Sequence, residues 1–181
     1  MIMSIKSFLL NIMGRGPYSQ KRLLDAGVKM GENVYIGTRK IDLTHGFLLE
    51  IGNNVTLSDC RILLHDASTK MFLGYSKVGK VVIGNNVFIG AGTVILPSVR
   101  IGNNVIIGAN STVTRNIPDN SVAFGSPAKV VKSLEEYLNK EKQRMAISPC
   151  FDDSYTLRKR VNMDMRMNQK KQLDGKWGYI E

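Results

Sequence analysis

One pentapeptide, Ile-Gly-Asn-Asn-Val, occurs three times in this chain of 181 residues, starting at Ile51, Ile83 and Ile101. Repetition of a segment at a fixed interval is the sequence signature of a repeat architecture. The second and third copies are offset by 18 in the numbering. This repeat constrains the fold more than any other feature of the chain.

The interval between these two copies divides into three hexads. Branched aliphatic residues recur every six positions from Ile83 to Val113, and the fifth position of each hexad is mostly small or β-branched. A spacing of six does not match a helix, but two inward positions per hexad fit a short strand whose alternate side chains face a core. The Gly-Asn-Asn and Gly-Ala segments between them suit tight corners, because Gly and Asn accept left-handed backbone angles. Three strands and three corners predict one coil of a triangular parallel β-helix, which is stabilised by stacking of successive coils.

The repeat also predicts the organisation of the chain. Ile51 and Ile83 are offset by 32 in the numbering, which exceeds one regular coil by 14, and the hexad phase is lost over about 65–80. We therefore expect an inserted loop there. The expected segments are a helical N-terminal segment (1–27), the β-helix domain (28–128), and a C-terminal capping helix with an irregular tail (129–181). Ser133 followed by Glu136 predicts the start of that helix.

The charge of the chain indicates which kinds of binding partner to expect. The chain has 25 Lys and Arg against 15 Asp and Glu, a net charge of +10, which favours anionic partners. Residues 51–132 include eight basic and three acidic residues, but the basic residues are spread out without interleaved aromatic residues. That pattern does not indicate nucleic-acid binding, so we expect a small-molecule or glycan acceptor. From the length of 181 residues we also do not expect the extra domain of a sugar-nucleotide transferase.

The two cysteines and the N-terminal residues indicate the cellular compartment that we expect for this protein. Cys60 and Cys150 form neither a disulfide framework nor a CxxC pair, so the expected compartment is the cytoplasm. Residues 1–13 are apolar, but Lys6 and Asn11 interrupt them and they are shorter than a membrane span. We expect a packed N-terminal helix, with peripheral membrane contact through residues 1–13 as the alternative.

Three further segments carry a resemblance to a known family: the His65-Asp66 pair at the start of the insertion, the run Ile83–Gly92, and the terminal Gly-Ser-Pro-Ala-Lys-Val of 125–130. Over about 25–135 the chain resembles the hexapeptide-repeat acyltransferases, and is most like bacterial polysaccharide O-acetyltransferases and maltose, galactoside and xenobiotic acetyltransferases. The resemblance implies an all-β, left-handed parallel β-helix with short helical terminal segments. It also implies acetyl-CoA as co-substrate and a homotrimer with its active site between neighbouring subunits.

Acyl transfer to a hydroxyl requires a base, and histidine is suited to that role at neutral pH. The chain has two histidines. His65 matches the position of the family's catalytic histidine and is the expected general base. His45 resembles the histidine of serine acetyltransferases more weakly, and a structural role is favoured for it. Asp66 is a candidate to orient His65, although adjacent strand residues point to opposite sides; Asp59 and Glu50 are equal candidates.

Positions offset by 18 stack on the same corner of successive coils, so Gly90–Gly92 is expected beside Gly108–Asn110, followed by Gly125–Ala128. This stripe of small residues would provide a smooth track for the pantetheine arm of CoA, although corner formation alone also explains glycines. Lysines at its end could contact the CoA phosphates, with Arg115 a weaker candidate. The expected coenzyme-binding residues are Gly90, Ala91, Ala109, Pro127, Lys129 and Lys132.

Other function classes stay open or are excluded. A γ-type carbonic anhydrase shares this solenoid but needs three histidine ligands per metal, and this chain has two. The resemblance instead implies an acyltransferase with no metal requirement that transfers acetyl from acetyl-CoA to a hydroxyl of a sugar, glycan or glycan precursor. The alternatives are N-acetylation of an amino sugar, O-acetylation of serine or an antibiotic, and a non-catalytic β-helix binding trimer.

Overall fold

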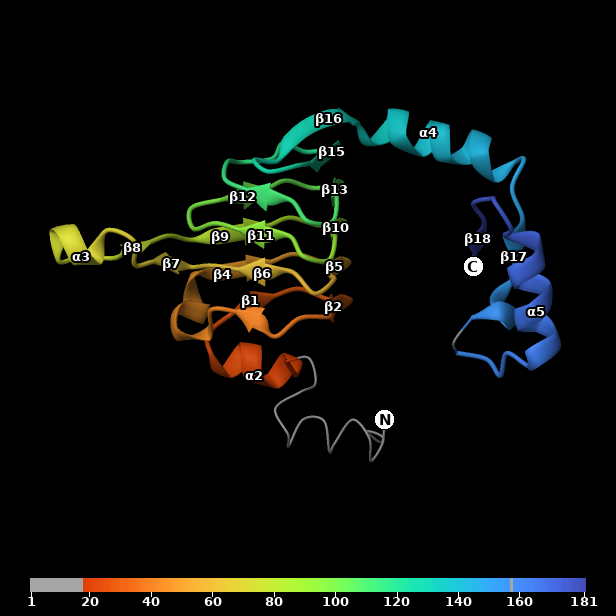
Figure 1. Cartoon of the computed structure of the whole chain (residues 1–181). Helices are drawn as coiled ribbons and strands as arrows, with labels where there is room; N and C mark the ends of the chain where they lie inside the picture. The colour runs from red at the N-terminus through yellow and green to blue at the C-terminus, as the bar shows by residue number, and fades with distance from the viewer. Residues whose placement is uncertain (1–17, 157) are drawn as a thin grey trace. The chain divides into compact units, whose positions relative to one another are not determined.

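The structure is a computed structural model that describes residues 18–156 and 158–181 (Figure 1). The chain divides into two compact units, one ending at Leu134 and the other spanning Glu135–Glu181. The predicted helix and the alternative membrane contact of residues 1–13 lie outside the described residues. Among the helices that are described, none combines the length and the apolar character required to cross a membrane.

The first unit is a parallel β-helix whose coils stack along one axis (Figure 1). Sheet A contains β1 (Lys29–Met30), β4 (Leu49–Ile51), β9 (Val81–Ile83) and β12 (Arg100–Ile101). Sheet B contains β2 (Val34–Ile36), β5 (Val55–Leu57), β10 (Val87–Ile89), β13 (Val105–Ile107), β15 (Ser121–Phe124) and β16 (Lys129–Ser133). Sheet C contains β3 (Lys40–Ile41), β6 (Arg61–Ile62), β11 (Val94–Ile95) and β14 (Thr112–Val113). Each coil visits sheets A, B and C in that order.

Aliphatic side chains from the three sheets fill the interior. The inward positions predicted from the hexads are buried, namely Ile83, Val87, Ile89, Ile95, Val99, Ile101, Val105, Ile107, Val113 and Ile117. Two buried polar side chains in this series are also satisfied, because Thr93 and Ser111 both donate to the Gly108 carbonyl, at 3.0 and 2.6 Å. The core is therefore closed without unpaired hydroxyls at these positions.

The three edges between the sheets differ in chemistry. The edge from sheet A to sheet B (A/B edge) carries a ladder in which each asparagine side-chain amide donates to the next asparagine at 2.9–3.0 Å, through Asn33, Asn54, Asn86, Asn104 and Asn120. These asparagines have φ of 55–56°, the left-handed region that the corner requires. The B/C edge is formed by the turns 37–39, 58–60, 90–93 and 108–111. The C/A edge is formed by 42–48, 63–80, 96–99 and 114–116.

Coil length varies along the solenoid. Paired residues of sheet B are 21 apart from β2 to β5, 32 apart from β5 to β10, and 18 apart from β10 to β13. The short helix η1 (Leu43–Leu48) lies in the long first coil. The second coil contains an antiparallel hairpin of β7 (His65–Asp66) and β8 (Lys77–Val78), with α3 (Lys70–Leu73) between its strands. Both additions lie on the C/A edge.

The described ends of the solenoid are covered by local structure. Helix α2 (Gln20–Asp25) begins after Ser19, whose side chain caps it, and its Leu23 is fully buried. At the other end, β16 pairs antiparallel with β15. The helix predicted to begin at Ser133 is present as α4 (Leu134–Met145), but the residues before it, 129–133, form a strand that the sequence did not predict. The reason is that the chain reverses through 125–128, and its backbone then satisfies the free edge of β15.

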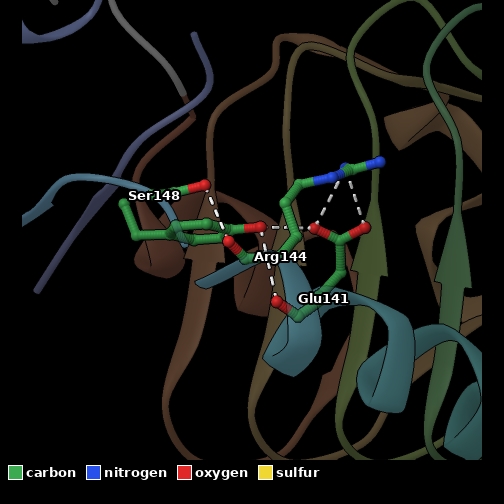
Figure 2. Close-up of polar contacts among 4 residues, drawn as sticks. Glu141, Arg144 and Ser148 are labelled. Atoms are coloured by element: carbon green, nitrogen blue, oxygen red, sulfur yellow. Dashed lines mark hydrogen bonds and ion pairs between the residues drawn. The ribbon is translucent and has the colours of Figure 1, made fainter. Parts of the chain in front are cut away.

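The second unit also corrects the expectation of an irregular tail. It contains most of α4 (Leu134–Met145), then β17 (Cys150–Phe151), η2 (Asp153–Tyr155), α5 (Met163–Gln172) and β18 (Tyr179–Ile180). Figure 2 shows its central polar contacts, in which Glu141 accepts from Arg144 at 3.0 Å and Ser148 donates to the Arg144 carbonyl at 2.7 Å. The Tyr179 hydroxyl donates to the Glu141 carboxylate at 2.8 Å. The pKa of Tyr179 is raised, mainly by burial and secondly by its hydrogen bond to Glu141.

Candidate active site

Two histidines and one aspartate meet on the C/A edge. Asp42 ends the first pass through sheet C and caps η1, accepting from the Thr44 backbone N–H at 3.2 Å. His45 lies within η1, and His65 opens the insertion hairpin one coil later. The stacking of β6 on β3 places these two passes side by side, since the Asp42 N–H donates to the Ile62 carbonyl at 3.1 Å.

One carboxylate oxygen holds both imidazoles. Oδ2 of Asp42 lies 2.5 Å from Nδ1 of His65 and 3.1 Å from Nδ1 of His45. The ring centroids of His45 and His65 are 4.9 Å apart. The Asp42 side chain is 9% exposed and that of His65 is 43% exposed, so the carboxylate is sheltered while the imidazole it contacts is open to solvent.

The protonation state of Asp42 follows from its neighbours. Burial on its own would raise the pKa of Asp42, but the hydrogen bonds from His65 and His45 outweigh it and hold the pKa of this carboxyl below its usual range. An ionised carboxylate is an acceptor only, so the Nδ1 atoms of both rings must carry the hydrogens. Nε2 of a neutral His65 then keeps its lone pair, which is the form that a general base requires.

The orienting group is therefore not the one expected from the sequence. Asp66 points elsewhere: it accepts from the Ser68 N–H at 2.8 Å and pairs with Lys77 at 2.6 Å. The expectation that Asp66 orients His65 is therefore wrong, because the side chains of adjacent residues in a strand point to opposite sides. Of the two other candidates, Asp59 pairs with Lys40 and Glu50 with lysines of sheet A and its flank.

The same trio has the donor types of a metal site. Asp42, His45 and His65 each offer one ligand atom, and these atoms lie within 4.8 Å of one another. Two imidazole nitrogens and one carboxylate oxygen suit a divalent transition metal. The hydrogen bonds to Asp42 already account for the arrangement of the three side chains.

The expected coenzyme track lies on the B/C edge. A Cβ added to Gly90 would approach the Ala109 backbone N to 2.5 Å, so coil stacking itself requires this glycine. Ala91 and Ala109 are different, because both are exposed and neither fills space in the core. The Asn110 N–H donates to the Ala91 carbonyl at 2.8 Å, which ties the two turns together. The alanines, rather than the glycines, are thus the positions that packing leaves unexplained.

The residues expected at the end of the track do not all lie on one edge. Pro127 is in the turn that follows β15, and Lys129 begins β16 directly after it. Lys132 lies opposite Val122, near the start of β15, and therefore toward the A/B edge rather than at the end of the track. Arg115 follows β14 and therefore lies on the C/A edge, away from the track. Within one chain the track and the histidine cluster occupy separate edges of the prism.

Comparisons with known proteins point to one family. A bacterial transferase hexapeptide (six repeats) family matches residues 80–115. Protein CapG of Staphylococcus aureus is 39% identical over 143 residues, which cover 75% of this chain and 83% of CapG. The galactoside O-acetyltransferase of Lactococcus lactis is 38% identical over 117 residues, covering 59% of this chain but only 56% of that enzyme.

Two solved structures of other proteins match part of this chain. An acetyltransferase from Vibrio cholerae in complex with acetyl coenzyme A is 23% identical, with a TM-score of 0.48, and the match covers 60% of this chain and 61% of that one. A maltose O-acetyltransferase from Clostridium difficile is 27% identical, with a TM-score of 0.43, and the match covers 61% and 72%.

The chain belongs to the bacterial hexapeptide-repeat transferases. The family resemblance read from the sequence is confirmed, and so is the fold class, a left-handed parallel β-helix. The enzyme class is confirmed as well: the protein is an acyltransferase of this family.

Proposed function

We propose that this protein transfers an acetyl group from acetyl-CoA to a hydroxyl of a sugar, glycan or glycan precursor, with His65 as the general base and Asp42 as the residue that positions it. The observation that carries the proposal is the 2.5 Å contact between Asp42 Oδ2 and His65 Nδ1. It orients an exposed imidazole with its Nε2 lone pair directed away from the carboxylate. We assign this chemistry to the β-helix of residues 28–128 with its insertion at 65–80.

The reaction needs one proton acceptor that later becomes a donor. Nε2 of His65 removes the proton of the acceptor hydroxyl while the oxygen attacks the thioester carbonyl carbon. The sheltered carboxylate of Asp42 stabilises the imidazolium that results. When the tetrahedral intermediate collapses, the C–S bond breaks and the imidazolium returns the proton to the CoA sulfur. The products are the acetyl ester and free CoA.

Acetyl-CoA is proposed as co-substrate on two grounds. The exposed alanines Ala91 and Ala109 leave a smooth track on the B/C edge, with Pro127 and Lys129 at its C-terminal end. The relative from Lactococcus lactis is named as an O-acetyltransferase.

Both cysteines are free thiols, Cys60 buried and Cys150 exposed, in keeping with a reducing compartment such as the cytoplasm.

We infer a homotrimer from the separation of the two edges. Since His65 and Ala109 lie on different edges of one prism, a complete site needs the C/A edge of one copy and the B/C edge of another. Two exposed apolar features support such packing. Tyr35 (62% exposed) and Phe88 (45% exposed) face outward on sheet B, and Phe72 at the tip of the insertion is 82% exposed. In the proposed trimer this tip contacts the neighbouring copy.

The first experiment is an acceptor screen. The full chain is incubated with acetyl-CoA and neutral sugars, uronic acids, amino sugars, serine or antibiotics, and free thiol is followed. O-acetylation of a sugar supports the proposal. The runner-up, N-acetylation, predicts that only amino sugars release CoA. Absence of thiol release with every acceptor would favour the non-catalytic binding trimer.

A second experiment tests the shared site. His65→Ala and Ala109→Trp chains, each inactive alone, are mixed after dissociation and allowed to reassociate. A site built from two copies predicts that roughly a quarter of the sites in a 1:1 mixture regain both intact halves, because each site then draws on two independently chosen chains. A mixture as inactive as its parents would place both halves of the site in a single chain and overturn the trimeric arrangement.

A further inference from the structure

A basic aromatic cluster lies at the N-terminal end of the B/C edge, in the first coil. Arg39 ends the turn between β2 and β3, and Tyr18 is bound to the same turn because its N–H donates to the Thr38 carbonyl at 3.3 Å. Arg22 comes from α2, close to Tyr18 in the chain. We call Tyr18, Arg22 and Arg39 the arginine cluster.

The two guanidinium groups converge on one ring. The Arg22 guanidinium carbon is 4.7 Å from the Tyr18 ring centroid, and that of Arg39 is 6.0 Å from it. Cation–π contacts of this kind hold the charges in place, but each contributes little at an exposed site and they do not neutralise the charge. Two positive groups are thus fixed near each other.

Within residues 18–156 and 158–181, neither guanidinium has a carboxylate partner, although Asp25 lies in the same helix as Arg22. The Nε atom of Arg39 is buried and has no hydrogen-bond partner there. Leaving a charged donor buried and unpaired is costly, so folded proteins normally supply an acceptor, which can be a ligand.

A neighbouring residue makes the contrast clear. Lys40 follows Arg39 directly, and its ammonium group pairs with Asp59 of the next coil at 2.9 Å. On the same edge, therefore, one cation is matched by a protein carboxylate while the adjacent arginine is not. A planar guanidinium fork is suited to bidentate capture of a carboxylate or phosphate group.

From the geometry we propose that the arginine cluster binds an oxyanion, a carboxylate or phosphate group, on the acceptor substrate. This assignment to the acceptor rests on the proposed function. The cluster is on the B/C edge like Ala109, three coils away, and coils are about 4.8 Å apart. If the CoA phosphates lie near Lys129, the thioester end of the track points toward the second coil, the level of His65. An acceptor placed there has the first coil beside it, so the enzyme selects anionic over neutral sugars.

Binding to the full chain is measured by ligand-detected NMR with glucose, glucuronate and glucose 6-phosphate. We expect saturable binding of one or both anions and none of glucose at the same concentration. Which anion binds distinguishes carboxylate from phosphate recognition. Arg39→Gln should weaken binding about tenfold or more, since a charge-assisted hydrogen bond is lost. The matched control Lys21→Gln removes the same charge from α2, and it should change affinity less than twofold.

Arg39→Lys guards against a folding artefact, because it keeps the charge and loses only the fork. Its melting temperature should equal that of the wild type, whereas its affinity for the anions should be several-fold lower. The inference is overturned if neither anion binds better than glucose, or if Arg39→Gln and Lys21→Gln have the same effect.

Acetyl transfer, measured in parallel, separates the two proposals. A selective loss of kcat/KM for an anionic acceptor in Arg39→Gln, with a neutral acceptor unaffected, supports the acceptor assignment. Equal effects on both acceptors remove that assignment but leave acetyl transfer standing. Anion binding that depends on Arg39 without transfer to any acceptor would mean that the proposed function fails and the anion site is real.

Discussion

Asp42 and His65 are well separated in the chain, yet the carboxylate oxygen Oδ2 of Asp42 lies 2.5 Å from Nδ1 of His65. In the pairing of β3 with β6, Lys40 lies opposite Arg61 and Ile41 opposite Ile62, so Asp42 and His65 fall on successive turns of the same edge. This contact fixes the ring orientation of the proposed base, and the predictions about catalysis start from it.

Asp42→Asn should lower turnover by about 10²-fold or more, because an amide can accept or donate and no longer selects the tautomer with a free Nε2 lone pair. Acetyl transfer from acetyl-CoA, measured with an accepted sugar, checks this. The control is Asp66→Asn, which removes a carboxylate next to His65 in sequence but not in contact with it, and should stay within a few-fold of wild type. Equal losses in both variants would contradict the role of Asp42.

His65→Ala should keep the fold and CoA binding and lose about 10²–10⁴-fold in turnover, the usual contribution of a positioned general base. His45→Ala should lose much less, since Asp42 still holds His65. Turnover and CoA affinity are measured for both variants. The opposite ranking would transfer the role of base to His45, and small losses in both would exclude histidine-based acyl transfer.

Ala109→Trp should abolish measurable CoA binding by calorimetry, because the indole would cover the exposed track between Ala91 and the turn after β15. Ala109→Ser is the matched control: it keeps a small side chain and should bind CoA like the wild type. A folded tryptophan variant with unchanged CoA affinity would remove the B/C edge from the coenzyme site.

Acid should weaken the insertion hairpin. The ammonium of Lys77, then the Ser68 N–H, lower the pKa of Asp66 from 3.8 to about 2. A carboxyl whose pKa is lowered in the folded state stabilises that state above its unfolded pKa, and the contribution is lost as the pH falls through the folded value. The melting temperature of Asp66→Asn should therefore be below that of the wild type at neutral pH, and the difference should shrink between about pH 4 and pH 2. A difference independent of pH would show that the ion pair does not stabilise the hairpin.

Much of the solenoid could be predicted because its rule is local. Each hexad buries its first and fifth positions, as Ile83 and Val87 show, and each coil repeats the same environment for the next. The insertion could be located for the same reason, since residues 65–80 break a phase that is regular on the C-terminal side. The family and the catalytic role proposed for His65 also followed from local motifs.

The orienting residue could not be found in this way. Counting back from His65 by the regular offset of 18 leads to Phe47, whereas the offset of 21 between β3 and β6 leads to Thr44, between Asp42 and His45. The additional residues belong to the coil that contains η1, and no hexad phase marks them. Adjacency in sequence favoured Asp66 instead, which the strand geometry directs toward Lys77.

The sequence by itself thus determined the β-helix, its coil spacing where the hexads are regular, the place of the insertion and the two histidines, because these depend on periodic burial and on residue types. Only the tertiary structure decided which carboxylate holds His65, that Arg22 and Arg39 share Tyr18, and that the histidines and the alanine track lie on separate edges. Those relationships depend on how irregular coils stack, and stacking is set by the number of residues each turn consumes rather than by the identity of the residues that meet.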